Sequence, residues 1–262
     1  MNQKKPDFPS KLRGTLLPTE HGSWGFIAEP ILLGLLIAPT IAGSALAVFS
    51  FCAFLLRTPL LRTMRARRAA APDPYGVWVR RFCLLCLLVS LGALVVAAFT
   101  ARGEWILPFI LAVPLALWAL HAQYRGKTRQ LFPEVISAVA LGAPATAMLL
   151  AAGTATISAY LAWGYLALKS ITSILFVRSQ IKRFHNRPHG RVSMLALHAA
   201  VPMGLAILDT DIAVIILYTM LALRAAILSY LPVRSAKQVG WIEVTVSLIF
   251  VIALAAIFPR VI

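Results

Sequence analysis

Long apolar runs alternate with short basic clusters along the whole chain. Each run is about as long as a membrane-spanning helix, which needs ~20 mostly apolar residues. Breaking the sequence at charge clusters and at Pro/Gly turns predicts nine spans, at 22–40, 43–61, 82–101, 105–123, 134–152, 158–177, 194–208, 212–230 and 241–258. The pattern therefore predicts an all-α, polytopic transmembrane helical bundle. Residues 1–21 would form a cytoplasmic N-terminal segment, and residues 22–262 a single membrane domain.

Two of these spans depart from the simple pattern. The seventh is short, and the fifth is rich in alanine and glycine and contains Gly142 and Pro144. Proline and glycine inside a span free backbone groups, which neighbouring helices or a water-filled cavity must then satisfy. The fifth span is thus expected to lie against other helices or beside a wet cavity.

Composition and charge support a membrane protein. Sixty per cent of the residues are hydrophobic and 13% are charged, too few for a soluble domain to cover its surface. The net charge of +16 is distributed in clusters between apolar runs. That distribution is typical of membrane topology, so we expect membrane lipids and no nucleic acid as partners. Cys52, Cys83 and Cys86 lie in apolar stretches and are interpreted as small core residues.

The basic residues also predict an orientation. Twenty-one of the 25 Lys and Arg residues fall on one side of the alternating spans. Basic connections stay in the cytoplasm, so the N-terminus is expected inside and, after nine spans, the C-terminus outside. The inner connections at 62–81 and 178–193 are expected to be long basic loops, whereas the outer connections are short.

Ionisable residues inside spans are costly and are candidates for function. They all fall in the cytoplasmic half of the predicted helices, which predicts a polar layer around a cavity that opens inward. Alternatively, the carboxylates and bases pair with one another and hold the bundle together. The residues concerned are Glu29, Lys169, Arg224 and Glu243 within spans, with Arg57 and Glu134 at inner helix ends.

The sixth span continues into a polar stripe. Its members recur at helical spacing, so they share one face of a helix that cannot face lipid. Guanidinium, ammonium, hydroxyl and amide donors suit a phosphate or another anionic head group. For the basic residues beyond the span, the alternative is anchoring to anionic lipid at the membrane surface. The predicted anion-binding residues are Arg57, Arg62, Lys169, Ser173, Arg178, Gln180 and Arg183, supported by Glu134, Arg224 and Glu243.

The segment before the first span could contribute proton transfer. Glu20 and His21, with Glu29 inside the span, are candidates for an acid/base role or for orienting the bases. The alternative is that this segment only begins the helix, with Trp24 at the membrane interface. Nucleophile-elbow, phosphate-loop and metalloprotease motifs are absent from the sequence, and we expect neither a metal nor a cofactor.

Three stretches resemble the YwiC-like family of bacterial integral membrane proteins. They are EHGSWG at 20–25, the Glu29-Pro30 pair and RSQIKR at 178–183. The resemblance implies a multi-pass protein of the bacterial cytoplasmic (inner) membrane. Little is known of this family's activity, so the resemblance implies no reaction.

The predicted architecture is also similar to that of the UbiA superfamily of intramembrane prenyltransferases. That superfamily binds magnesium and a prenyl diphosphate through Asp-rich motifs after its second and sixth helices. The corresponding stretches here, RTPLLR at 57–62 and RSQIKR at 178–183, contain no aspartate. The magnesium ligands therefore do not carry over, although arginines can meet an anion directly.

Two classes of function follow from these patterns. The leading hypothesis is a UbiA-like bundle whose cytoplasm-facing cavity binds an amphipathic anion, a phosphorylated lipid or an isoprenoid, with a divergent lipid-modifying transferase as its catalytic form. The alternative is a non-catalytic transporter or membrane assembly factor.

Overall fold

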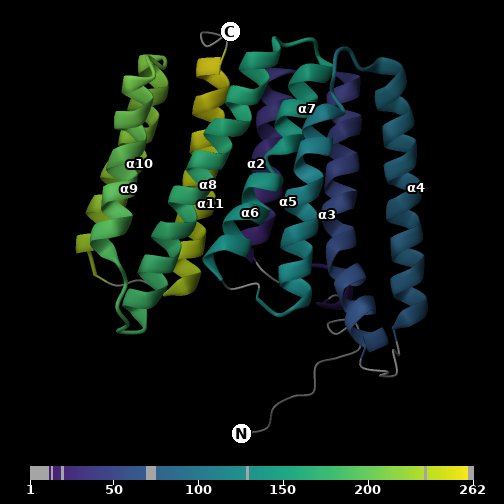
Figure 1. Cartoon of the computed structure of the whole chain (residues 1–262), viewed down its shortest axis with the longest axis horizontal. Helices are drawn as coiled ribbons and strands as arrows, with labels where there is room; N and C mark the ends of the chain where they lie inside the picture. The colour runs from purple at the N-terminus through teal and green to yellow at the C-terminus, as the bar shows by residue number, and fades with distance from the viewer. Residues whose placement is uncertain are drawn as a thin grey trace, which may run out of the picture.

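The computed structural model describes residues 12, 14–18, 21–68, 75–127, 130–232 and 235–258, and gives the backbone alone for residues 21 and 67. Ten helices form one bundle in this part of the chain, and its described residues contain no strand (Figure 1). The predicted all-α membrane bundle is confirmed.

The helices follow the predicted spans closely. Within the described residues, seven segments are long and apolar enough to cross a membrane, with α6 and α7 together forming the segment Leu131–Ala151. Helices α2 and α9 are shorter but apolar. The bounds are α2 His21–Ile37, α3 Ile41–Arg68, α4 Gly76–Thr100, α5 Leu107–Tyr124, α6 Leu131–Ala140, α7 Ala143–Ala151, α8 Thr156–Phe184, α9 Arg191–Ile207, α10 Ile212–Tyr230 and α11 Ala236–Ile257.

The two basic connections are more helical than expected. Helix α3 continues to Arg68 and α8 to Phe184, so much of the stretches expected as loops prolongs the spans. Arginine, lysine and glutamine are good helix formers, and nothing in these stretches breaks the helix before its observed end. Arg62, Arg65, Arg68 and the basic residues of 178–184 therefore lie on helices rather than on loops.

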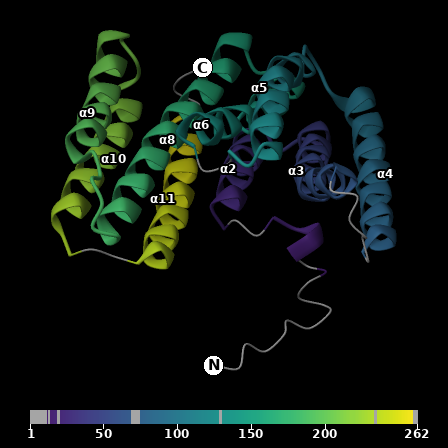
Figure 2. The ribbon, with the colours of Figure 1, turned by 60° about the horizontal axis from the view of Figure 1, so that its bottom comes forward.

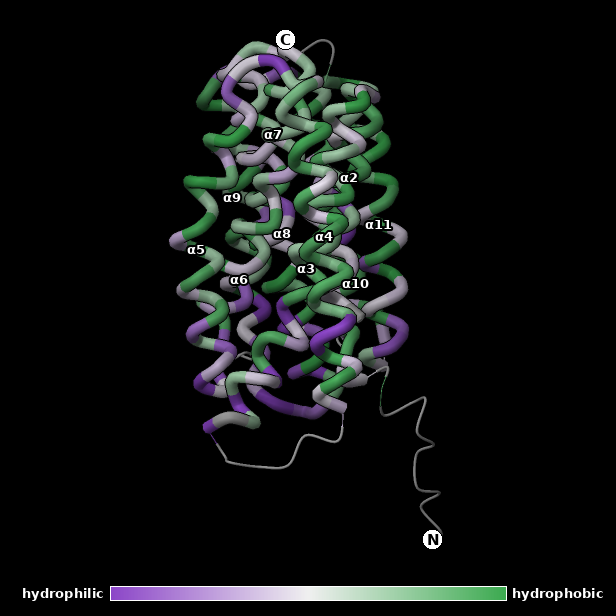
Figure 3. The backbone as a smooth tube through the Cα atoms, turned by 90° about the vertical axis from the view of Figure 1, so that its right-hand side faces the viewer, coloured by the Kyte–Doolittle hydropathy of each residue, from purple (hydrophilic) through white to green (hydrophobic). Residues whose placement is uncertain are grey.

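The bundle has an apolar body and one hydrophilic end (Figure 3). Helices α3, α5, α8 and α10 finish at this end, which we call the basic end and which carries Arg62, Arg65, Arg183 and Arg187. The α9–α10 hairpin lies at one side of the bundle and α4 at the other, with α2, α7 and α8 between them (Figures 1 and 2). Every residue of α7 is buried, so this short helix lies at the centre of the bundle.

The fifth predicted span is broken between α6 and α7. The helix stops at Ala140, and Pro144 lies in the first turn of α7. Trp163 of α8 covers the break, and its indole Nε1 donates a hydrogen bond of 2.7 Å to the Val139 carbonyl. A neighbouring helix therefore satisfies one of the freed backbone groups. This is one of the two alternatives predicted from the sequence, the other being a water-filled cavity.

Gly142 at this break should not tolerate a side chain. A Cβ atom there would lie 2.7 Å from Trp163 Cδ1 and 2.9 Å from the Nε1 that makes the hydrogen bond. We expect Gly142→Ala to lower the free energy of unfolding in detergent by about 1–3 kcal/mol, the usual cost of overpacking. Gly164→Ala on α8 is the matched control, because a Cβ there meets nothing within 4 Å. Equal stability of the two variants would contradict the prediction.

Candidate functional site

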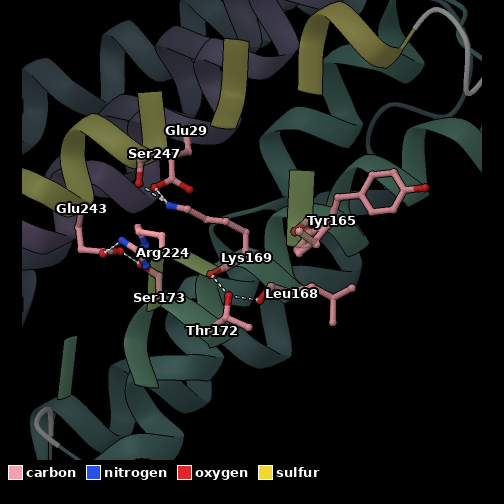
Figure 4. Close-up of polar contacts among 10 residues, drawn as sticks. Glu29, Tyr165, Leu168, Lys169, Thr172, Ser173, Arg224, Glu243 and Ser247 are labelled. Atoms are coloured by element: carbon pink, nitrogen blue, oxygen red, sulfur yellow. Dashed lines mark hydrogen bonds and ion pairs between the residues drawn. The ribbon is translucent and has the colours of Figure 1, made fainter. Parts of the chain in front are cut away.

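A buried ion pair joins the first span to the sixth. Lys169 Nζ of α8 lies 2.5 Å from Glu29 Oε1 of α2 and also donates to the hydroxyl of Ser247 on α11 (Figure 4). The lysine is only 2% exposed, and Glu29 and Ser247 are buried as well. Three helices thus meet at one ammonium group.

A second ion pair lies one helical turn away. Arg224 of α10 pairs with Glu243 of α11, which also accepts a hydrogen bond from Ser173 of α8 (Figure 4). The Arg224 guanidinium carbon lies 4.3 Å from the centre of the Phe176 ring, within cation–π range. The Arg224 guanidinium is thus held by the Glu243 carboxylate and by the face of the Phe176 ring.

The two pairs form one ladder between α8 and α11. Lys169 and Ser173 are four residues apart on α8, as Glu243 and Ser247 are on α11, so each pair shares a helix face. Lys169 meets Ser247, and Ser173 meets Glu243. We call Glu29, Lys169, Ser173, Arg224, Glu243 and Ser247 the charge ladder. Its two carboxylates balance its two bases.

No residue of the charge ladder lines either of the two cavities described below. The reason is electrostatic: a charge taken out of water must be paired, and the nearest opposite charges in the ladder fulfil that need without a ligand. The geometry therefore favours the sequence-based alternative in which Glu29, Lys169 and Arg224 hold helices together.

The rest of the predicted stripe also contacts protein groups. Arg178 pairs with Glu134 of α6, with 2.8 Å between Nη1 and Oε2, and both side chains are partly exposed. Gln180 is buried. Arg183 donates to the carbonyls of Leu228 and Leu231, where α10 ends and its backbone acceptors lack helical partners.

The remaining predicted site residues fall in different places. Arg62 donates to the Thr15 hydroxyl and lies 5.3 Å from the Tyr75 ring centre. Glu20 lies outside the described residues, as does the side chain of His21, so their acid/base role stays a prediction. Glu29 is engaged by Lys169.

A cavity of about 390 Å³ lies between α3, α5 and the α6–α7 segment. Its walls are almost entirely apolar. Arg57 is the one charged residue among the described residues that line it, and Ser50, Gln123 and Ser137 are its other strongly polar ones. The apolar lining residues are Ile27, Phe49, Ala53, Phe54, Leu56, Leu60, Phe109, Ala112, Val113, Ala116, Leu117, Ala119, Leu120, Ala140, Leu141, Ala143 and Pro144.

Arg57 and Gln123 lie toward the basic end of this cavity. Both α3 and α5 run toward that end, and these two residues follow most of the apolar lining positions on their helices. The Gln123 side-chain amide donates to the Ser137 hydroxyl at 3.5 Å, across to α6. The Arg57 guanidinium carbon lies 5.8 Å from the Phe54 ring centre, and Phe54 contacts Trp24 edge-to-face. The opening segment of α2 therefore borders the charged part of the cavity.

A second cavity, of about 600 Å³, lies between α9 and α10 and is lined by apolar and small residues together with Thr219 and Tyr230. None of its described lining residues carries a charge.

Ser173 was predicted from the sequence, but three other neutral members of the two sites were not. Ser247 completes the Lys169 contacts, while Gln123 and Ser137 supply the cavity with amide and hydroxyl groups. The four-residue spacing of Glu243 and Ser247 was a usable signal, because it matches that of Lys169 and Ser173. Nothing in the local sequence distinguishes Gln123 from an interface glutamine.

Comparison with known families identifies the chain. The model of a family described as YwiC-like protein matches residues 17–152, just over half of the 262 residues. The chain belongs to the YwiC-like family. The match runs from α2 to α7 and includes every helix that lines the 390 Å³ cavity. Together with its apolar helices, this makes the YwiC-like chain a multi-pass membrane protein.

No curated protein and no solved structure matches the chain. The similarity to the UbiA superfamily therefore stays an architectural prediction.

Proposed function

We propose that this YwiC-like protein binds an amphipathic anion, a phosphorylated lipid or an isoprenoid, in the cavity between α3, α5 and the α6–α7 segment. The observation that carries the proposal is the guanidinium of Arg57, the one charged group among the described lining residues, near the basic end of a largely apolar cavity. From the positive-inside rule we expect that end at the cytoplasmic face, and we propose the bacterial inner membrane as the location.

The chemistry of the cavity fits both parts of such a ligand. Its volume falls in the usual range of ligand pockets, ~300–1,000 Å³, and its apolar walls suit a hydrocarbon chain. A guanidinium binds phosphate or carboxylate through parallel hydrogen bonds. The side chains of Gln123 and Ser137 lie at the same site and can donate to oxygens of the head group.

The other predicted anion-binding residues have a different part in this proposal. Arg62 lies five residues after Arg57 on α3, and its positive charge attracts anionic head groups to that end of the bundle. The predicted residues on α8 support the site indirectly, by fixing this helix against its neighbours. They are Lys169, Ser173, Arg178, Gln180 and Arg183.

The proposal predicts that Arg57 selects the lipid that co-purifies with the protein. We expect Arg57→Gln to reduce a specific anionic lipid in the detergent extract by about tenfold or more, since a hydrogen bond to a charged group contributes ~1.5–3 kcal/mol. Mass spectrometry of extracted lipids measures the change. Lys182→Gln is the matched control, because Lys182 is an exposed base at the basic end of α8.

Identical bulk phospholipids in the wild type and both variants would contradict the proposal. Two assays of the same purified protein distinguish the functional classes. A transferase yields a new lipid product from a prenyl or acyl donor, whereas a transporter accumulates solute in vesicles. A binding or assembly role gives neither result but keeps the Arg57-dependent lipid.

A further inference from the structure

We infer that the ligand carries one hydrocarbon chain in the cavity and enters it sideways from the membrane, through an opening between α3 and α5. This inference rests on the proposed function, because it concerns the same cavity. It adds the route of entry and the chemical class, a single-chain amphipathic anion.

Helices α3 and α5 touch at two heights. Far from the basic end, Phe49 and Phe109 pack edge-to-face with 5.3 Å between their ring centres. At the basic end, the Arg65 guanidinium donates to the backbone carbonyl of Gln123. These two contacts close the space between the helices above and below the cavity.

Between the two contacts the cavity wall is incomplete. Leu60 of α3 and Val113 and Leu117 of α5 line the cavity, yet they are 46%, 50% and 60% exposed. The wall formed by α2 and α7 is closed, since Ile27 and Ala143 are 2% and 0% exposed. In a membrane, apolar side chains exposed on the flank of a bundle face the lipid chains. The exposed rim is therefore an opening to the hydrocarbon.

The dimensions of the opening suit one chain lying along the helices. On α5 the lining runs from Phe109 to Gln123, fourteen residues apart in sequence, which corresponds to ~21 Å of helix. Half of a hydrocarbon core is ~15 Å thick, so the cavity is long enough for the chain of a lipid in one leaflet. The 390 Å³ volume lies near the low end of ligand pockets, which favours one hydrocarbon chain over two.

The cavity has its charged residue near one end, and this determines the orientation of the bound ligand. Arg57 would hold the anionic head, and the chain would run toward the aromatic pair of Phe49 and Phe109, ~12 Å along α3 from Arg57. A lipid already in the inner leaflet has this direction, with its head at the cytoplasmic surface. It can therefore slide between α3 and α5 without turning over.

Photocrosslinking at the rim tests the route. We would place p-benzoylphenylalanine at position 117, or at 118 as the control, in full-length protein reconstituted into phosphatidylcholine vesicles with a minor fraction of hexadecyl phosphate. Trp118 is exposed on the same helix but does not line the cavity. We expect hexadecyl phosphate adducts at 117 to exceed the share of that lipid in the vesicle several-fold, and adducts at 118 to match it. Adding Arg57→Gln should return the adducts at 117 to that share.

Three other results have distinct meanings. Adducts at 117 in proportion to vesicle composition, with Arg57-dependent retention of hexadecyl phosphate on purification, would overturn sideways entry and leave the proposed function standing. Loss of Arg57-dependent retention would overturn the proposed function itself. Equal enrichment of phosphatidic acid at 117 would overturn the single-chain class. Repeating the experiment with palmitate shows whether the head is a carboxylate or a phosphate.

Discussion

Lys169→Met should destabilise the YwiC-like protein by about 3–5 kcal/mol, the usual cost of leaving one partner of a buried ion pair uncompensated. The Glu29 carboxylate would lose its counter-charge inside the membrane domain, and the Ser247 hydroxyl would lose its donor. Methionine keeps most of the lysine volume, so packing changes little. Reversible unfolding in mixed micelles measures the free energy.

Two variants separate the charge effect from a general effect of substitution. Lys182→Met removes an exposed base from the same helix and should change stability by less than about 0.5 kcal/mol. The double variant Lys169→Met/Glu29→Gln removes both charges and should recover most of the loss, because a neutral pair needs no counter-charge. If the double variant were as unstable as Lys169→Met alone, the ion pair would not be the cause.

The helices were predictable because the membrane imposes a length and a composition on each of them. Spans such as 212–230 agree with α10 to the residue, since apolar runs bounded by charge or proline leave little choice. The helical extension of α3 to Arg68 was missed because charge was taken as the end of a helix. Charge ends the membrane crossing, but arginine itself favours the helical backbone.

The partners of the charges were not predictable from sequence. A pool of three carboxylates and three bases gives many pairings, and only the packing of distant helices selects Glu29 with Lys169 and Glu243 with Arg224. The same holds for the cavity, which depends on how α5 sits against α3 and on the break before α7. Both features depend on tertiary packing, which cannot be deduced from the spacing of residues in the sequence.

The structure separates two groups of residues that the prediction from sequence had merged. The cavity is lined by α2, α3, α5, α6 and α7, and its charged residue is Arg57. The charge ladder is built mainly by α8, α10 and α11, and its only member from the first half is Glu29. Stability and ligand binding should therefore respond to different substitutions. Changes at Arg57 should alter the bound lipid, and changes in the ladder should first alter unfolding.

Glu243→Ala should show the second large effect. Its carboxylate is the counter-charge of Arg224 and the acceptor for Ser173, so both groups lose a partner at once. We expect a loss of about 3–5 kcal/mol in the free energy of unfolding, measured in the same mixed micelles. Glu243→Gln should lose less, because an amide oxygen still accepts hydrogen bonds although the charge is gone.

Substituting Arg224 in the Glu243→Ala variant tests whether an unpaired charge causes the loss of stability. Removing the arginine as well, in Glu243→Ala/Arg224→Leu, should recover part of the loss, since no unpaired guanidinium then remains inside the bundle. Recovery will be incomplete, because the leucine cannot replace the contact of the guanidinium with the Phe176 ring. A double variant less stable than Glu243→Ala would mean that Arg224 stabilises the bundle through the Phe176 ring rather than through its ion pair with Glu243.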